Sequence, residues 1–296
     1  MAPFFLSEFE NYLKVEKRFS NYTLLAYKKD IEQFSVFASI SELHDFYKIS
    51  SSTVRAWIVS LVDNSMENKS VNRKLSALRA FFKWLKKEYN ITSNPLAKIK
   101  GPKNIKRLPQ FAKVSELNNN KLSEVIPNGF DGLRDRLIFE VFYQTGIRLS
   151  ELVNLKESAI NDHSLKVLGK RNKERIIPIA TQLNYLINEY KTAKKELGLQ
   201  NEYLFVLPNG NKLYAKFVYR RINKYLSETT SLDKCSPHVL RHTFATHMLN
   251  NGAGLETLKE ILGHANLGAT QIYTHNSFAS LVNVYSQAHP RGHKNT

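Results

Sequence analysis

The segment from Ser236 to His275 holds the densest group of side chains in the chain that could do chemistry. His238 and Arg241 are three residues apart, and in a helix this spacing places both side chains on one face. His264 and Tyr273 follow, nine residues apart. An arginine pairs with phosphate oxygens, a neutral histidine accepts a proton, and a tyrosine hydroxyl becomes a nucleophile once a base or cation activates it. Together they suggest attack of a tyrosine oxygen on the phosphorus of a phosphodiester.

Each of these side chains taken alone has an ordinary explanation. A single histidine or arginine on a helix is most often a surface or capping residue, and a single tyrosine is most often half-buried packing. The ordered set is more specific. The run HVLRHTFATHMLNNGAGLETLKEILGHANLGATQIYTH closely resembles the box that ends the catalytic domain of tyrosine recombinases, particularly the Xer type. The resemblance implies that Tyr273 is the nucleophile and that His238, Arg241 and His264 act with it.

A second arginine follows a predicted helix break. The segment from Asp131 to Leu155 predicts a helix, a break at Gly146 and a second helix. Arg148 comes just after the break, with Glu151 three residues on. On the surface such a pair contributes little to stability. The motif TGIRLSEL resembles the family's segment with the first catalytic arginine, which implies that Arg148 is that residue and Glu151 its positioning partner.

A candidate proton donor lies on a predicted hairpin. The runs SLKVLG and RIIPI alternate around a turn at KRNKE, which predicts a β-hairpin from Ser164 to Ile179. The segment resembles the family's hairpin, whose catalytic lysine corresponds to Lys170. A lysine there could protonate a leaving oxygen, although hairpin tips are often lysine-rich for solubility alone. Arg171 stands where the family usually has glycine, which leaves Lys173 as an alternative.

Composition bounds the class of protein. A length of 296 residues suggests two domains, and a net charge of +17 with a pI near 9.7 is typical of proteins that bind polyanions. Ribosomal and membrane-surface proteins share that charge. The single cysteine, Cys235, forms no intrachain disulfide, and the N-terminus resembles neither a signal peptide nor a membrane span. We therefore expect a cytoplasmic protein.

The N-terminal region predicts four helices in residues 1–95 and resembles the helical, SAM-like core-binding domain of Xer-type recombinases. The fourth helix, SVNRKLSALRAFFKWLKKEY, has an apolar stripe and a basic face. Such a face either is solvated or lies along a DNA backbone. The apolar stripe contains Val71, Leu75, Leu78, Phe82 and Leu85, and the basic face contains Arg73, Lys74, Arg79, Lys83, Lys86 and Lys87.

Residues 96–112 predict a basic interdomain linker, because the proline and glycine content opposes helix and strand. Residues 113–296 then form the catalytic domain. Within it, the run YAKFVYRRINKYL predicts a helix that carries Lys216, Arg220, Arg221 and Lys224, which could enter a DNA groove or face water. The C-terminal helix resembles the tail that Xer-type proteins dock on a neighbouring protomer, and packing on its own domain is the alternative.

The expected fold class is mainly α (α+β), with a small antiparallel β element in the catalytic domain. The resemblance implies an enzyme that cuts and rejoins DNA through a 3′-phosphotyrosyl intermediate, with no cofactor and no metal. It also implies a homo- or hetero-tetramer on paired DNA sites, with a possible DNA translocase. Compact Xer proteins resolve chromosome dimers, and the ending AHPRGH resembles their tail. Integrases of some mobile elements are equally compact.

Two other classes of function compete with this one. His238, His242, His247 and His264 could suggest a metal-dependent hydrolase, but no HExxH motif or clustered carboxylate accompanies them, and Arg241 would repel a cation. The run GLETLKEILGHANLGATQIY also fits a helix-turn-helix, which would suggest a non-catalytic DNA-binding protein. Such a protein has no use for the catalytic set.

Overall fold

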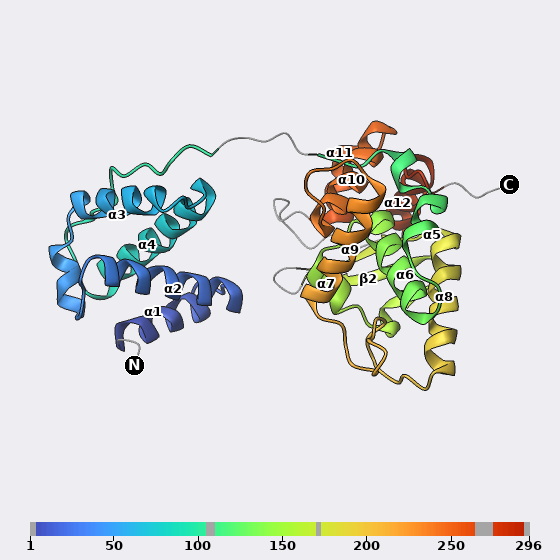
Figure 1. The fold of residues 1–296 in the computed structure, drawn as a ribbon, viewed down its shortest axis with the longest axis horizontal. Helices are drawn as coiled ribbons and strands as arrows, with labels where there is room; N and C mark the ends of the chain where they lie inside the picture. The colour runs from blue at the N-terminus through green and yellow to red at the C-terminus, as the bar shows by residue number, and fades with distance from the viewer. Residues whose placement is uncertain (1–3, 105–109, 170–172, 264–274, 293–296) are drawn as a thin grey trace. The chain divides into compact units, whose positions relative to one another are not determined.

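The structure is a computed structural model that describes residues 4–104, 110–169, 173–263 and 275–292. The chain divides into two compact units, Met1–Arg107 and Leu108–Thr296, called unit 1 and unit 2 (Figure 1). Helices dominate both units, and the described sheet is small, which confirms the mainly α prediction. Among the helices of these described ranges, none is long and apolar enough to cross a membrane.

Unit 1 contains the four predicted helices. Two of them begin at serine caps, because the hydroxyls of Ser20 and Ser50 accept hydrogen bonds from the backbone N–H groups of Thr23 (3.3 Å) and Thr53 (3.2 Å). These bonds satisfy donors that a helix N-terminus leaves free. The helices are α1 Phe4–Val15, α2 Asn21–Phe37, α3 Ser51–Asp63 and α4 Asn68–Glu88, with a short 3-10 helix, η1 Leu43–Lys48, between α2 and α3.

Helix α4 organises the core of unit 1, since it packs against both α2 and α3. The apolar stripe predicted for it is buried. Aromatic rings extend this core: Phe81 of α4 makes edge contacts with Phe9 of α1 and with Phe46 of η1, at centroid distances of 5.0 and 4.8 Å. Burial of such rings is a main source of stability for a domain of this size.

One residue of the predicted basic face of α4 is not at the surface. Lys74 is 4% exposed, and its Nζ lies 3.0 Å from Oδ1 of the buried Asp30 of α2. The outward placement of Lys74 was wrong because its partner lies 44 residues earlier in the chain, which a helical period cannot reveal. Arg73 also pairs with Asp30. Exposed residues on this face are Arg73, Arg79, Lys83, Lys86 and Lys87.

The segment that follows α4 packs back on unit 1. Residues 90–104 contain no α-helix or strand, and residues 105–109 lie outside the described ranges. Leu96 and Ile99 are nevertheless buried in the core of unit 1. Asn72 Nδ2 of α4 also donates a hydrogen bond of 2.8 Å to the carbonyl oxygen of Pro102. The first residues of the predicted linker are therefore attached to unit 1.

Unit 2 surrounds a three-stranded antiparallel sheet with helices. Its strands are β1 Ile160–Asn161, β2 Ser164–Leu168 and β3 Glu174–Pro178, in the order β1-β2-β3. Short 3-10 helices, η2 Val114–Leu117 and η3 Glu157–Ala159, add to the α-helices. The α-helices are α5 Asn119–Val125, α6 Phe130–Thr145, α7 Leu149–Val153, α8 Thr181–Glu196, α9 Ala215–Thr229, α10 Pro237–Asn250, α11 Leu255–Leu262 and α12 His275–Ala288.

Strands β2 and β3 form the predicted hairpin. Val167 pairs with Arg175 in the register, and the backbone N–H of Gly169 donates a 2.8 Å hydrogen bond to the carbonyl oxygen of Lys173. Leu165, Val167 and Ile177 point into the core, as strand alternation requires. The two-residue strand β1 is too short to leave an alternating pattern in the sequence.

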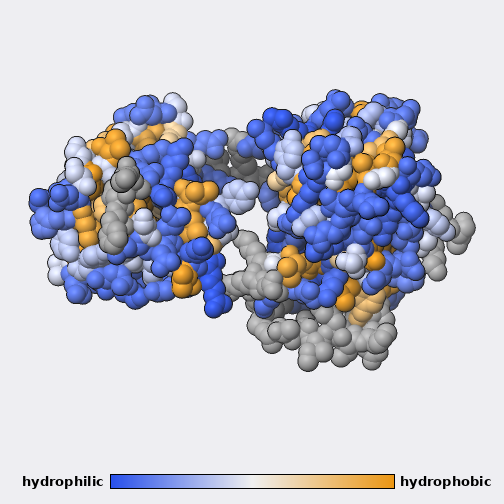
Figure 2. Space-filling model, turned by 90° about the horizontal axis from the view of Figure 1, so that it is seen from below, coloured by the Kyte–Doolittle hydropathy of each residue, from blue (hydrophilic) through white to orange (hydrophobic). Residues whose placement is uncertain are grey.

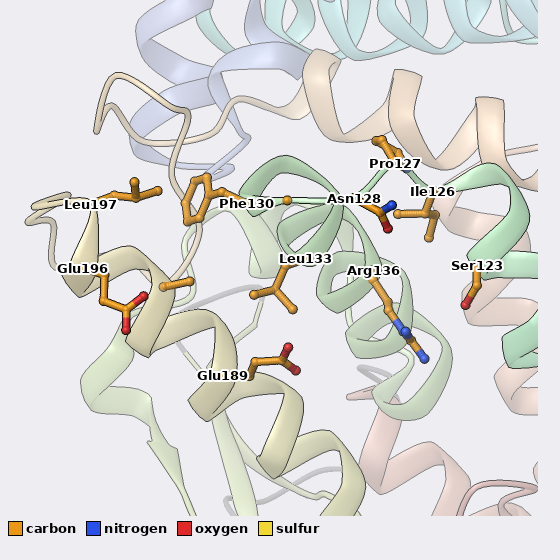
Figure 3. Close-up of a pocket in the computed structure, with 13 residues that line it drawn as sticks. Ser123, Ile126, Pro127, Asn128, Phe130, Leu133, Arg136, Glu189, Glu196 and Leu197 are labelled. Atoms are coloured by element: carbon orange, nitrogen blue, oxygen red, sulfur yellow. The ribbon is translucent and has the colours of Figure 1, made fainter.

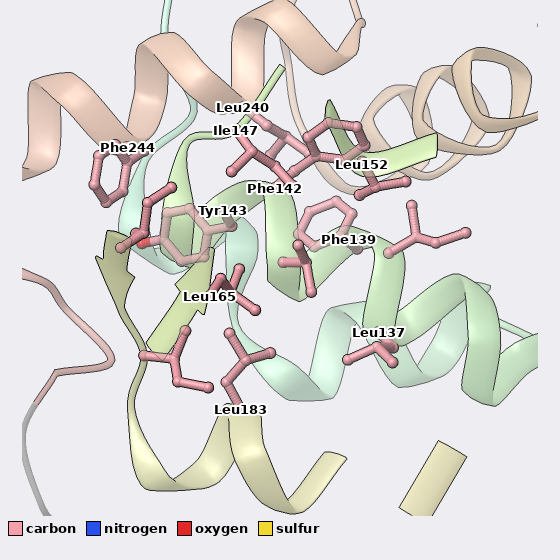
Figure 4. Packing of buried hydrophobic residues seen from close by; sticks show 14 of the residues in the cluster. Leu137, Phe139, Phe142, Tyr143, Ile147, Leu152, Leu165, Leu183, Leu240 and Phe244 are labelled. Carbon is pink, nitrogen blue, oxygen red and sulfur yellow. The ribbon is translucent and has the colours of Figure 1, made fainter. Parts of the chain in front are cut away.

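Helix α6 is the centre of unit 2 and packs against α8 and α10. Figure 4 shows Phe139, Phe142 and Tyr143 of this helix among side chains from the sheet and from α10. The helix ends at Gly146, which has a φ of +60°. An added Cβ there would lie 2.5 Å from a ring carbon of Phe244, so glycine is required both by conformation and by space. The predicted break is confirmed.

Helix α12 packs on its own unit, against α10 and β3. Leu281, Tyr285 and Ala288 join the core. Beyond the helix, Arg291 Nη2 lies 3.0 Å from Oε1 of Glu140 on α6. Of the two positions considered for the C-terminal helix, this structure contains the one on its own unit.

The face of the molecule in Figure 2 is mainly hydrophilic in each unit, with hydrophobic residues in separate patches. The exposed large apolar residues are likewise spread over many elements. Scattered apolar residues of this kind are normal on a protein surface and do not indicate a binding site.

Candidate active site

Arg148 and Glu151 are joined by the way α7 begins. Arg148 is the N-cap residue of α7, and its backbone N–H donates a 2.7 Å hydrogen bond to Glu151 Oε2. Its guanidinium Nη1 donates a second bond, 2.8 Å long, to Oε1 of the same carboxylate. The side chain of Glu151 is 3% exposed and that of Arg148 24%. Glu151 is therefore a buried anchor for Arg148, not half of a surface ion pair.

A third residue, Arg175 of β3, holds the same carboxylate. Its Nη1 and Nη2 lie 2.9 and 2.8 Å from Oε1 and Oε2 of Glu151, which is the two-pronged geometry that an arginine fork makes with a carboxylate. The residue is only 5% exposed. The sequence reasoning missed it, although a signal exists: Arg175 occupies an inward position of β3, where the alternating pattern calls for an apolar side chain.

The end of α11 brings these arginines together with Arg241 of α10. The last carbonyl groups of a helix lack partners inside the helix and carry partial negative charge. Ile261 O accepts a 2.7 Å hydrogen bond from Arg175 Nε. Leu262 O accepts a 2.7 Å bond from Arg241 Nη2, and Gly263 O accepts a 3.0 Å bond from Arg148 Nη2. Each guanidinium thus caps a different carbonyl of one helix end.

Arg241 also reaches the break between α6 and α7, because its Nη1 donates a hydrogen bond to the carbonyl oxygen of Gly146. Gly146 lies two residues before Arg148. The two arginines proposed from the sequence as phosphate ligands are therefore both held at the break between α6 and α7, Arg148 as part of it and Arg241 by its hydrogen bond from α10.

The charges at this site do not balance. Burial alone would raise the pKa of Glu151, but hydrogen bonds and charge from Arg175, and then from Arg148, lower it to about 2. Burial, followed by repulsion from Arg148 and Arg175, lowers the pKa of Arg241 to about 10. Three guanidinium groups, those of Arg148, Arg175 and Arg241, thus meet around the carboxylate of Glu151 and the end of α11, and among the described contacts Arg241 has no carboxylate of its own. An anion bound here would relieve the repulsion.

His238 lies in the first turn of α10, where it is exposed to solvent. It is one helical turn before Arg241, so both side chains lie on one face of α10, as the spacing predicts. Lys170, His264 and Tyr273 lie outside the described residues. Lys173, the alternative to Lys170, is exposed at the described end of the hairpin turn.

His247, one of the histidines that could suggest a metal site, is a core residue. Its Nε2 lies 3.0 Å from the carbonyl oxygen of Ala112, which can only accept, so Nε2 carries the proton. Its Nδ1 then accepts from the hydroxyl of Tyr143, also 3.0 Å away. Burial lowers the pKa of His247. Over the part of the chain that the structure describes, there is no group of three or more His, Cys, Asp or Glu side chains that could hold a metal.

A pocket of about 520 Å³ lies elsewhere, between α5, α6 and α8. Figure 3 shows Ser123 on α5, Leu133 and Arg136 on α6, and Glu189 and Glu196 on α8 around it. None of the candidate site residues lines this pocket. The arginine site is instead built around the end of α11 and the break between α6 and α7.

Comparisons with known families identify the class of protein. Residues 113–280 match the Phage integrase family, and residues 6–89 match the family described as Phage integrase, N-terminal SAM-like domain. The chain belongs to the phage integrase family of tyrosine recombinases. It is therefore an enzyme, a DNA strand transferase of the site-specific recombinase class, and the predicted recombinase family is confirmed.

Its relatives include Xer-type proteins. Tyrosine recombinase XerC of Natranaerobius thermophilus is 38% identical over 300 residues, which cover 97% of this chain and 98% of the relative. Tyrosine recombinase XerC of Staphylococcus saprophyticus is 39% identical over 286 residues, which cover 95% of this chain and 96% of the relative. The similarity extends over nearly the whole length of both chains, as the Xer-type resemblance predicts.

Solved structures share the fold. XerH site-specific recombinase, in a post-cleavage complex with a palindromic difH substrate, has a TM-score of 0.69 and 22% identity, covering 95% of this chain and 84% of that one. A lambda integrase dimer bound to a COC′ core site has a TM-score of 0.68 and 21% identity, covering 88% and 73%. A helical SAM-like unit followed by a mainly helical unit with a small sheet is thus a recombinase architecture.

Proposed function

We propose that this chain cuts and rejoins DNA through a covalent bond between Tyr273 and a DNA 3′-phosphate. The observation that supports this most is the cationic site in which Arg148 and Arg241 lie beside the buried carboxylate of Glu151. Such a site favours an anion that carries several acceptor oxygens, and a phosphodiester is that kind of anion.

In the first step the hydroxyl oxygen of Tyr273 attacks phosphorus, and the bond between phosphorus and the 5′ oxygen breaks. His238 takes the proton of the Tyr273 hydroxyl, Lys170 gives a proton to the departing 5′ oxygen, and His264 donates a hydrogen bond to the phosphate. In the second step a 5′-hydroxyl of another strand attacks the same phosphorus. The bond to Tyr273 then breaks, and both protons return.

Arg148 and Arg241 stabilise the charge that develops on the nonbridging oxygens, which is usually the largest contribution to catalysis at such sites. A guanidinium has five N–H bonds. The hydrogen bonds among the described residues occupy two of them in Arg148 and two in Arg241. The other N–H bonds are the proposed phosphate ligands.

The reaction needs no cofactor. Because the phosphotyrosyl bond conserves the free energy of the phosphodiester, rejoining requires neither ATP nor a metal ion. We expect EDTA to leave adduct formation unchanged, and loss of the adduct in EDTA with rescue by Mg²⁺ would contradict this part of the proposal.

Residues 1–95 are proposed to bind the core DNA site, residues 96–112 to follow the phosphates as a linker, and residues 113–296 to perform catalysis. The exposed basic face of α4 supplies phosphate contacts in this scheme. On α9 the candidates are the exposed residues Lys216, Arg220 and Lys224. Arg221 is a weaker candidate, because its Nε lies 3.3 Å from Oδ2 of the buried Asp135.

The proposed substrate is a double-stranded recombination site, on which the chain forms a homo- or hetero-tetramer with a second recombinase. The solved structure of a lambda integrase tetramer bound to a Holliday junction supports this assembly by analogy. In cytoplasm, the proposed role is to resolve chromosome dimers before cell division, under possible control of a DNA translocase. The XerC relatives support that role, and integration of a mobile element is the alternative with the same chemistry.

The test uses nicked duplexes that carry candidate sites from the host's replication terminus. A nick lets the short product diffuse away, so the covalent complex accumulates. We expect a protein–DNA adduct on a denaturing gel with the unmodified chain and with Tyr185→Phe, which changes an exposed tyrosine of α8. Tyr273→Phe is expected to bind without forming the adduct. Binding without any adduct, even after host extract supplies a partner recombinase, would overturn the proposal.

A further inference from the structure

We propose that Arg175 is a positioning residue of the strand-transfer reaction, because its guanidinium joins the hairpin, the buried carboxylate that anchors Arg148, and the end of α11 into one unit. The inference rests on the proposed function and deepens it. Arg175 touches no substrate in this scheme, since it is buried and acts through Glu151 and through two backbone segments.

The hydrogen bonds of Arg175 account for its orientation. All three nitrogen atoms of its guanidinium donate: Nη1 and Nη2 to the carboxylate of Glu151, and Nε to the carbonyl oxygen of Ile261 at 2.7 Å. A lysine could supply the charge but not three fixed directions. The guanidinium of Arg175 therefore holds together strand β3, the start of α7 and the end of α11.

Two glycines lie beside this guanidinium, and at Gly263 the contact is too close for a larger residue to fit without a shift. At Gly263, whose φ is +64°, an added Cβ would lie 3.1 Å from Arg175 Cδ and 3.2 Å from Nη1. At Gly169 an added Cβ would lie 3.5 Å from Nη1 and 3.7 Å from Glu151 Oε1. In the sequence, Gly169 is followed by Lys170 and Gly263 by His264. The described residue before each of these two proposed catalytic residues therefore lies against Arg175.

Arg175 also determines whether the guanidinium of Arg148 can contact a phosphate. Glu151 is buried and charged, so it must be neutralised from within the protein. With Arg175 present, most of that neutralisation comes from the two-pronged pair on β3. Without it, Arg148 is the remaining partner of Glu151 among the described contacts and would turn from the phosphate toward the carboxylate.

The first experiment compares Arg175→Gln and Arg175→Lys with the unmodified chain on nicked duplex. The matched control is Lys166→Gln, which removes an exposed cation from β2 of the same hairpin. We expect adduct formation to slow about 100-fold in Arg175→Gln and less in Arg175→Lys, which keeps a positive charge near Glu151. The dissociation constant for the duplex should stay within about threefold, because exposed cations elsewhere supply the phosphate contacts.

The second experiment separates positioning from a general structural role. A duplex with sulfur in place of the bridging 5′ oxygen has a leaving group that departs without protonation, because a thiol is far more acidic than an alcohol. If Arg175 positions the hairpin that carries the proton donor, the rate deficit of both Arg175 variants relative to the unmodified chain should be about tenfold smaller on this substrate. Arg175→Lys keeps a positive charge beside the buried carboxylate of Glu151. This variant therefore still tests the inference if Arg175→Gln does not fold.

Unchanged adduct formation in both Arg175 variants would overturn the inference. A slower rate of adduct formation that is explained by weaker DNA binding would also overturn it. The same holds if the rate deficit of the variants is as large on the sulfur substrate as on the normal duplex. A failure of the proposed function looks different, because then the unmodified chain and Lys166→Gln would form no adduct either.

Discussion

Asp30 in unit 1 and Glu151 in unit 2 are buried carboxylates that each pair with two cations, but the two sites differ in what the cations can do. In unit 1, Asp30 pairs with Lys74 and Arg73, and Lys74 is buried together with Asp30. In unit 2, Glu151 pairs with Arg175 and Arg148, and Arg241 adds a third guanidinium that has no carboxylate of its own among the described contacts.

The difference lies in how the excess charge is placed. In unit 1 the extra cation, Arg73, pairs with Asp30 and is 43% exposed, so water hydrates its charge. In unit 2 the extra cation is largely withdrawn from water, and its pKa falls to about 10 through burial and repulsion by Arg148 and Arg175. A structural ion pair needs no such arrangement. A site for an anionic substrate does, because the anion supplies the missing charge.

The largest expected effect comes from removing the excess cation of unit 2. Arg241→Met should slow covalent adduct formation about 1000-fold, since it deletes a donor that acts on the developing phosphate charge. It should not lower the thermal stability of the chain, because the substitution also removes repulsion from Arg148 and Arg175. A melting temperature that drops steeply while cleavage per folded molecule is retained would make Arg241 a structural residue like Lys74.

For unit 1 we expect a substitution at the buried ion pair to lower the stability of the unit. Asp30→Asn leaves Lys74 as a buried charge without its carboxylate and should reduce the free energy of unfolding by about 4 kcal/mol. Both tryptophans, Trp57 and Trp84, are in unit 1, so urea unfolding followed by their fluorescence reports on this unit. Asp63→Asn, at an exposed position of α3, is the control and should change little.

A smaller effect concerns pH. The pKa of Glu151 is depressed to about 2 from an ordinary value of 4.5, so its stabilising contribution is complete above pH 4.5 and is lost as the pH falls toward 2. The stability difference between the unmodified chain and Glu151→Gln should therefore shrink by about 2 kcal/mol between pH 5 and 2.5. Urea unfolding followed by circular dichroism measures it.

The control for this pH experiment is Glu256→Gln, at an exposed position of α11. Its stability difference from the unmodified chain should stay nearly constant across the same range. A Glu151→Gln difference that also stays constant would mean that Glu151 is not held as a buried anion.

The smallest expected effect is binding of a simple anion. Inorganic sulfate, compared with chloride at equal ionic strength, should stabilise unit 2 by about 1 kcal/mol, because a bound anion relieves the repulsion at Arg241. The stabilisation should disappear in Arg241→Met and persist in Lys195→Met, which changes an exposed residue of α8. Equal stabilisation of all three proteins by sulfate would indicate a general salt effect.

Local signals in the sequence were sufficient for much of this fold. Period and turn residues predicted the four helices of unit 1 and the hairpin, and Gly146 marked the end of α6 because a left-handed residue before a new helix favours glycine. Arg148 and Arg241 were predicted as site residues by resemblance, since each lies in a motif similar to one of the tyrosine recombinase family. That the two arginines lie at one site depends on the tertiary structure, which the motifs do not predict.

Long-range partners were the part that sequence could not supply. Lys74 was assigned to the surface and is buried, because Asp30 is distant in the chain. Arg175 was passed over as part of a strand, although it joins β3 to Glu151 and to Ile261, which is 86 residues away. Both residues are charged side chains at buried positions, where each forms an ion pair with a residue distant in the sequence. The periodicity of a helix or strand does not predict such a partner.

The central claim is that Arg241 acts on the negative charge of a phosphate. The most direct test is cleavage of a nicked duplex that carries a methylphosphonate at the scissile position, where one charged oxygen is replaced by a neutral methyl group. On this substrate the deficit of Arg241→Met relative to the unmodified chain should shrink from about 1000-fold to about tenfold. An equal deficit on both substrates would show that Arg241 serves the protein's structure rather than the phosphate charge.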